Sequence, residues 1–171
     1  MPDRVIRNRR VEADHWLVIG LPPHGDLSAL PAGPVIVPLA VWKDRRAELL
    51  DRAQPVGVWL APDEEPGEIA VDLGLLPIVA VHFPKYGDGR GYSTGVLLRT
   101  RHGYRGELRA FGDIGRDHLF QLARCGFDSF RLADHRDPEA ALAAFDEFTI
   151  RYQGSVDDSV PLYRKRIGAA T

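Results

Sequence analysis

The sequence has a single cysteine, Cys125, among its 171 residues. One thiol excludes an internal disulfide and a cysteine-rich metal or cluster site. No stretch approaches the roughly 18 consecutive apolar residues of a membrane-spanning helix. The opening "MPDRVIRNRR" also lacks the apolar core of a signal peptide. We therefore expect a cytoplasmic protein that does not associate with membranes.

A large excess of charge of either sign is also missing, since the formal net charge is −2. Without an overall basic field, nucleic acid is not an expected partner. The charge is nevertheless uneven. Residues 61–84 carry five Asp or Glu and no Lys or Arg, whereas residues 85–124 carry eight Lys or Arg against four Asp or Glu. The pattern indicates either two solvated faces of one domain or a local anion site in the cationic block.

Hydrophobic patterning predicts five short strands that alternate with helices. The strands are expected at "PVIVPL", "VGVWLA", "PIVAVHF", "ELRAFG" and "FDSFRLA", with helices in most of the intervening segments and after the last strand. Such alternation is typical of an α/β protein with a mainly parallel sheet. Five units fall short of the eight in a closed barrel. We predict an open sheet or a partial (βα) barrel of about five strands, its open edge covered by a second copy or by the C-terminal tail.

Three segments are expected along the chain. We expect an irregular or hairpin-forming start over residues 1–33, the βα-repeat domain over 34–150, and an extended C-terminal arm over 151–171.

Two helix ends are marked by local chemistry. Gly126 is expected to stop one helix, and Asp137 is expected to cap another whose first residue is Pro138.

The stretch "FPKYGDGRGYSTG", residues 83–95, is rich in glycine and follows a predicted buried strand. It is not a dinucleotide fingerprint, because Tyr92 stands where the third glycine would be, and no Gly-Lys-Ser/Thr follows as in a Walker loop. Its glycines favour either a tight turn or a loop whose backbone approaches an anion. Ser93 is expected to cap the helix that follows.

Ligands of open parallel sheets gather at the carboxyl ends of the strands. That edge is expected to collect the loops after residues 83, 111 and 132, the last bearing Asp134, His135 and Arg136. We predict an oxyanion site there, for a sulfur oxyanion or a phosphate-bearing small molecule. The candidate ligand-binding residues are Lys85, Asp88, Arg90, Asp113 and Arg116. The alternative is that Asp88 and Asp113 pair with the arginines and hold the loops together without a ligand.

Other reactive side chains favour structural roles. Cys125 near a helix end is expected to pack in the core, because the negative end of the helix dipole disfavours a thiolate. A lone helical histidine such as His118 is more often structural. Asp113 and Asp117 suit a cap and a salt-bridge partner. No histidines stand at metal-ligand spacing, so we expect no metal site, and no cofactor is assigned.

Four blocks are distinctive as sequence: "DGRGYS", "GYRGELRA-GD", "RD-L--L-RCGFD" and the late "YQ...V...P-LYRKR". With these blocks, over roughly residues 34–166, the chain resembles an uncharacterised bacterial family, domain of unknown function 934. The first 30 or so residues resemble no family. One departure is "HFPKY", where an acidic or aromatic first residue is expected, and therefore no family role is assigned to His82.

The resemblance implies a place in sulfur metabolism. Members of the family are encoded beside assimilatory sulfite reductase and phosphoadenylylsulfate reductase, and are often labelled as oxidoreductases of sulfite reduction. No catalytic residues can be carried over. We therefore expect an accessory protein or an oxidoreductase of assimilatory sulfite reduction. The alternative is a non-catalytic partner that binds the sulfite reductase polypeptide.

Overall fold

The computed structural model describes residues 3–21, 29–146, 155, 156 and 158, and one sheet forms the centre of this part of the chain. All five predicted strands are present in it. They are β4 (Val35–Pro38), β5 (Val56–Leu60), β6 (Ile78–Phe83), β7 (Glu107–Gly112) and β8 (Ser129–Arg131). Each is parallel to the next. The predicted α/β class and parallel sheet are therefore confirmed.

The sheet is larger than predicted, with eight strands rather than about five. The added strands come from the first residues of the chain: β1 (Arg4–Arg7), β2 (Arg10–Ala13) and β3 (Leu17–Val18). Strand β3 extends the parallel series, whereas β1 lies antiparallel to both β8 and β2. The strand order is β2-β1-β8-β7-β6-β5-β4-β3. These strands have two to four residues each, too few for periodicity to predict them.

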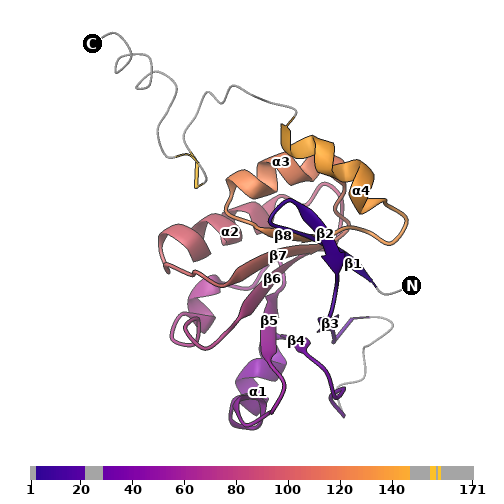
Figure 1. Cartoon of the computed structure of the whole chain (residues 1–171). Coiled ribbons are helices and arrows are strands. Elements are labelled where there is room, and N and C mark those ends of the chain that lie inside the picture. Colours follow the sequence, from indigo (N-terminus) through magenta and orange to yellow (C-terminus); the bar gives the residue numbers. More distant parts are fainter. Residues whose placement is uncertain (1–2, 22–28, 147–154, 157, 159–171) are drawn as a thin grey trace.

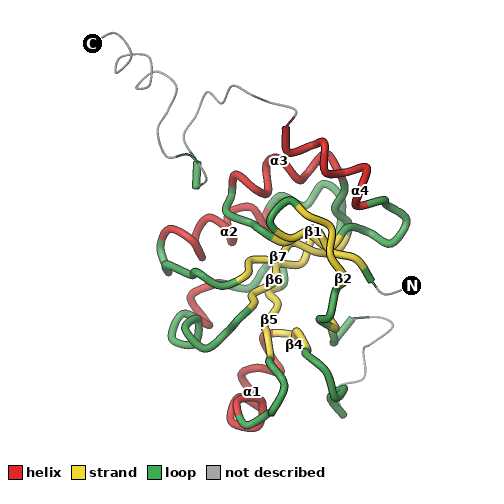
Figure 2. Tube along the Cα trace, in the orientation of Figure 1, coloured by secondary structure: helices red, strands yellow, loops and turns green. Residues whose placement is uncertain are grey.

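The helices lie along one side of the sheet, which curls into a half-barrel (Figures 1 and 2). They are α1 (Leu39–Leu50), α2 (Arg90–Thr100), α3 (Arg116–Arg124) and the short α4 (Pro138–Ala141), with 3-10 turns at Pro66–Ile69 and Leu142–Asp146. The curvature follows from the strand order. Strands β3 to β8 are neighbours in chain order, so every right-handed crossover places its helix on the same side.

Helix α2 packs unusually close to the sheet. A Cβ atom added at Gly91 would lie 2.5 Å from the ring of Phe83, and one at Gly95 would lie 2.4 Å from the ring of Phe127. The two glycines are four residues apart and share one face of the helix. Two glycines of "GDGRGYSTG" therefore serve helix–sheet packing.

The predicted helix ends are mostly confirmed. Gly126 has φ +98° beyond the end of α3, and the Asp137 carboxylate accepts the backbone N–H of Glu139 at 3.1 Å. The Ser93 prediction is wrong, because α2 begins three residues earlier at Arg90 and Ser93 lies inside it. Cys125 is buried in the core, as expected. The predicted C-terminal arm, 151–171, lies almost entirely outside the described residues.

The concave face carries aromatic and charged side chains in rows set by the register. Because paired residues of parallel strands point to the same side, three rows cross β6, β7 and β8. From the amino to the carboxyl end they are Ile78 with Glu107, then Ala80 with Arg109 and Ser129, then His82 with Phe111 and Arg131. The last row borders the carboxyl rim.

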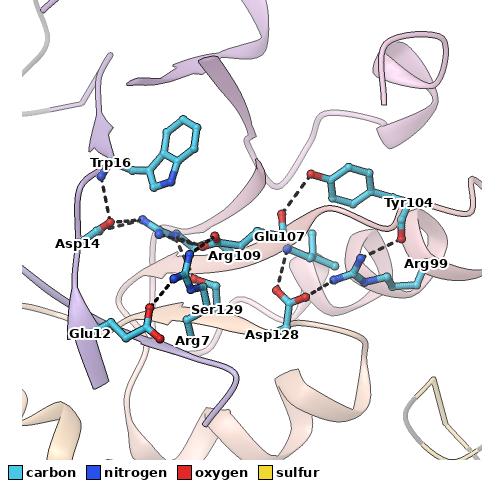
Figure 3. Close-up of polar contacts among 11 residues, drawn as sticks. Arg7, Glu12, Asp14, Trp16, Arg99, Tyr104, Glu107, Arg109, Asp128 and Ser129 are labelled. Atoms are coloured by element: carbon cyan, nitrogen blue, oxygen red, sulfur yellow. Dashed lines mark hydrogen bonds and ion pairs between the residues drawn. The ribbon is translucent and has the colours of Figure 1, made fainter. Parts of the chain in front are cut away.

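Arg109 is the central polar residue of this face, and its side chain is 1% exposed (Figure 3). It donates to both carboxylate oxygens of Asp14 at 3.0 and 2.8 Å, and Asp14 is also 1% exposed. Its other donors reach Glu107 at 2.9 Å and the Ser129 hydroxyl at 3.1 Å. Asp14 in turn accepts the Trp16 N–H. The N-terminal segment is thereby tied to β7 and β8.

We expect Asp14→Ala to lower the free energy of unfolding by about 3 kcal/mol, because it leaves a buried guanidinium without its main partner. Urea denaturation followed by circular dichroism measures this change. Glu48→Ala is the matched control: it also removes a carboxylate from an arginine, but the Arg45–Glu48 pair spans one exposed turn of α1. The control should leave the denaturation midpoint nearly unchanged, and equal effects of the two variants would contradict the prediction.

Candidate functional site at the carboxyl rim

The loops after β6 and β7 meet at the carboxyl rim, as the strand order predicts. The Tyr86 N–H donates to the Asp113 carboxylate at 3.1 Å, and the Asp113 N–H donates to the Phe83 carbonyl at 2.7 Å. The Tyr86 hydroxyl donates to Asp117 at 2.6 Å. Asp113 and Asp117 therefore tie one loop to the other.

His118 and Arg136 flank Tyr86 and extend this junction to the loop after β8. The Gly115 N–H donates to His118 Nδ1 at 3.0 Å, and His118 Nε2 lies 2.9 Å from the Tyr86 carbonyl. With Nδ1 accepting and Nε2 donating, both ring nitrogens have a hydrogen-bond partner. The Arg136 guanidinium lies over the Tyr86 ring, 5.5 Å from its centre. His118 thus has the structural role expected of it.

The predicted arginine Arg90 is occupied by a neighbour in the chain. Its Nε and Nη2 donate to the two oxygens of Asp88 at 3.0 and 2.7 Å, and its backbone N–H also donates to Asp88. These bonds to Arg90 lower the pKa of Asp88 to about 2. The Asp88 carboxylate thus fills the position at the start of α2 where an anion was expected.

The other predicted ligand-binding residues are dispersed around the rim. Lys85 is exposed in the loop after β6, Arg116 is the exposed first residue of α3, and Asp113 faces the concave side. Of the five, Asp113 alone borders either of the two rim hollows described below.

The larger rim hollow has a volume of about 880 Å³ and lies over the last row of the concave face. A volume of this size suits a ligand of cofactor dimensions. Its lining is mixed in polarity. Val18, Leu21 and Phe111 are its apolar side chains, and its polar side chains include His82, Asp113, Asp134 and His135.

His82 is the half-buried polar group of this wall. Its ring stacks on Phe111, with 5.0 Å between ring centres, and the Trp59 ring lies edge-on to it at 5.7 Å. No described residue hydrogen-bonds either ring nitrogen. Burial lowers the pKa of His82 below its ordinary value of 6.5. At neutral pH it is a neutral imidazole with hydrogen-bonding capacity to spare.

A second hollow of about 230 Å³ adjoins the first and is bordered by three arginines, Arg4, Arg131 and Arg136. Both hollows share the residues of the strip between them: Asp3, Arg131, Leu132, Ala133 and Asp134. With Asp3 and Asp134 in its wall, the smaller hollow sets three guanidinium groups against two carboxylates.

The three arginines differ in how firmly they are paired. Arg131 donates to Asp3 at 2.9 Å, and Arg4 donates to Asp137 at 3.2 Å. Arg136 has no carboxylate partner among the described residues, and its Nε is buried without a hydrogen bond there. A guanidinium left in this state has donors available for an anion.

Sequence reasoning placed Arg136 at this rim but missed Asp3, Arg4 and Arg131. Arg4 and Asp3 reach the site because β1 pairs antiparallel with β8, which brings the start of β1 to the carboxyl end of β8. No local signal in the sequence specifies this pairing. The turn at Asn8 and Arg9, whose φ angles of 49° and 62° suit a two-residue hairpin, joins only β1 to β2.

Two classes of site are not found among the described residues. No group of three or more His, Cys, Asp or Glu side chains there could hold a metal ion. None of the helices in that part of the chain combines the length and apolar character needed to cross a bilayer.

A family model matches residues 57–163, which is more than half of the chain. Its description is "Bacterial protein of unknown function (DUF934)". The chain belongs to this family, and the resemblance drawn from its sequence blocks is confirmed. No curated protein matches the chain.

We expect His82 to make stability depend on pH. Its folded-state pKa is below the unfolded value, so the unfolded chain binds the proton more readily. The stability contribution is therefore complete above pH 6.5. It is lost as pH falls below that value, and the loss levels off beneath the folded-state pKa. The difference in unfolding free energy between wild type and His82→Leu, measured from pH 8 to about pH 5, should change in this window. A constant difference would contradict the prediction.

Proposed function

We propose that this member of the family binds a doubly charged oxyanion, of the sulfur-oxyanion or phosphate class, at the carboxyl rim of its sheet. We propose further that it does so as an accessory protein or an oxidoreductase of assimilatory sulfite reduction. The observation that carries the anion site is the hollow bordered by Arg4, Arg131 and Arg136. The link to sulfite reduction rests on the gene neighbourhood that the family resemblance implies.

The pairing of the arginines favours this hollow over the loop around Arg90. Asp3 and Asp137, the partners of Arg131 and Arg4, are 61% and 59% exposed. Exposed ion pairs contribute about 0–1 kcal/mol, so a divalent anion can replace them at small cost. Asp88 is 12% exposed and accepts three hydrogen bonds from Arg90. An incoming anion would have to displace that carboxylate.

The geometry suits oxyanion chemistry. Guanidinium groups present planar pairs of N–H donors that match the oxygens of sulfite, sulfate or phosphate. The site lies at the end of a parallel sheet, where ligands of α/β proteins commonly bind. In the oxidoreductase form of the proposal, electrons come from a donor bound from outside the chain. A flavin or haem absorbance of the purified protein would mark such a donor.

We expect Arg136→Gln to weaken the binding of sulfite, sulfate or phosphate about tenfold or more, because it removes a charge-assisted donor. Isothermal titration calorimetry with each anion measures the effect. Arg90→Gln is the matched control, since it removes the same charge from the same rim at a residue paired with Asp88. It should leave anion affinity nearly unchanged. No binding by the wild type, or equal losses in both variants, would refute the anion site.

A second candidate function is a non-catalytic partner of the sulfite-reducing system. Its support lies at the opposite, amino end of the sheet, where Leu50 and Leu75 border a hollow of about 430 Å³ while 41% and 55% exposed. Val71, 89% exposed, lies four residues before Leu75. Exposed apolar side chains in a group favour protein contacts. The acidic residues Asp63, Glu64, Glu65 and Glu68 precede this group in the chain.

If this second function is correct, Leu75→Glu should abolish co-purification with the sulfite reductase polypeptide, because it places a charge in the apolar contact. Lys85→Glu is the control, since it also introduces a carboxylate at an exposed residue but at the carboxyl rim, outside both rim hollows. It should leave co-purification intact. Retention of the partner by Leu75→Glu with unchanged anion binding would count against the amino-end contact.

A further inference from the structure

The two rim hollows share a wall, so a single ligand can extend from one hollow into the other. Asp3 and Arg131 border both hollows, and their ion pair at 2.9 Å stands between them. The smaller hollow is the cationic one, while the larger is aromatic and mixed in polarity. A free tetrahedral anion would occupy the smaller hollow and leave about 880 Å³ beside it unused.

We propose that the ligand is a nucleotide, with its phosphate or sulfate group on Arg131 and Arg136 and its planar base in the larger hollow beside His82 and Phe111. This inference rests on the anion site proposed above and adds the chemical class of the whole ligand. It concerns a binding site formed by side chains of β1, β6, β7, β8 and the loop after β8.

The aromatic wall suits the base. His82 and Phe111 are neighbours in one row of the concave face, and their rings stack on each other at an interplanar angle of 24°. Aromatic side chains and bases associate through their flat surfaces and apolar edges. Val18 and Leu21 extend the apolar wall. A purely hydrophobic ligand would not need the polar side chains that also line this hollow.

The polar groups match the hydrogen-bonding edge of a base and the hydroxyl groups of a sugar. The His82 ring nitrogens have no hydrogen-bond partner among the described residues, and burial keeps the ring neutral by lowering its pKa. A neutral imidazole offers one donor and one acceptor. Asp134 borders both hollows, so its carboxylate is placed to accept from a sugar hydroxyl between base and phosphate.

The test compares AMP with inorganic phosphate and sulfate by isothermal titration calorimetry on the full chain. We expect AMP to bind at least about tenfold more tightly than phosphate, because base contacts add to the anion contacts. His82→Leu should remove most of that advantage and leave phosphate binding within about twofold. His102→Leu makes the same chemical change at a residue outside both hollows and should preserve AMP binding. Melting curves confirm that each variant is folded.

The outcomes separate this inference from the proposed function. If phosphate or sulfate binds and AMP binds no more tightly, the nucleotide inference is overturned while the anion site stands. Equal AMP affinity in wild type and His82→Leu overturns it as well. If neither AMP nor any of the anions binds, both proposals fail. An AMP affinity that falls in both His82→Leu and Arg136→Gln, but not in His102→Leu, supports the two-part site.

Discussion

The buried contact between Arg109 and Asp14 is the constraint on which the rim depends. A guanidinium in the interior is tolerated only when its donors are satisfied, and here Asp14, Glu107 and Ser129 satisfy them. Asp14 directly follows β2, so this contact holds the N-terminal hairpin against the last two parallel strands. The hairpin in turn places Asp3 and Arg4 at the carboxyl end of β8. Loss of the Arg109–Asp14 pair would therefore disturb the placement of Asp3 and Arg4, even though no residue of the candidate site is changed.

The curled sheet separates structural and binding tasks on its two faces. The convex face packs against helices through apolar residues such as Val79, Leu108 and Phe130. In the part of the chain that the structure describes, no crossover helix covers the concave face, which carries the polar rows of β6, β7 and β8. On this face, the polar groups around Arg109 are paired with one another, whereas His82 borders the larger hollow. Arg109 and His82 lie in adjacent rows of the concave face, so the strand register places the ion-pair network beside the open wall.

The sequence predicted strands β4 to β8 because each of them has a recognisable local pattern. Segments of six or seven residues rich in apolar side chains marked β4 to β8, and the chemistry of Gly126 and Asp137 marked two helix ends. A hairpin was one of the two alternatives for residues 1–33, and β1 and β2 form one. Its place in the sheet was not predicted, for a physical reason. The pairing of Ile6 with Phe130 joins residues far apart in the chain, and no local pattern of either strand specifies its partner. Arg4 and Arg131 could therefore not be assigned to one site.

The glycine-rich stretch shows a different limit. Its composition was compatible with a turn or an anion loop, and sequence could not separate them. The structure assigns Gly91 and Gly95 to contacts with Phe83 and Phe127, and it assigns the helix start to the carboxylate of Asp88. Both outcomes depend on side chains that approach from elsewhere. The structure bears out one part of the prediction, the meeting of the loops after β6 and β7 at one edge of the sheet, which follows from topology.

Besides the contacts of Arg109, a second cluster of polar contacts lies at the amino ends of β7 and β8 (Figure 3). We call it the clamp, and it explains part of the family blocks. Arg99 donates to the carbonyls of Tyr104 and Gly106 and to the Asp128 carboxylate, each at 2.8 Å. Asp128 also accepts the Leu108 N–H at 2.9 Å, and burial raises its pKa. Arg99 lies four residues before "GYRGEL", and the other residues of the clamp come from "GYRGEL" and "RCGFD".

The clamp and the candidate site therefore lie at opposite ends of the sheet. The family match begins at residue 57, beyond Asp3, Arg4 and Asp14. It therefore covers the whole clamp but only part of the rim: Arg131 and Arg136 lie within it, and the β1 wall does not. Membership of the family accordingly covers strands β6 to β8, nearly all of β5, and the clamp. The case for the cationic hollow rests on contacts of this chain, above all on the antiparallel pairing that brings Arg4 beside Arg131.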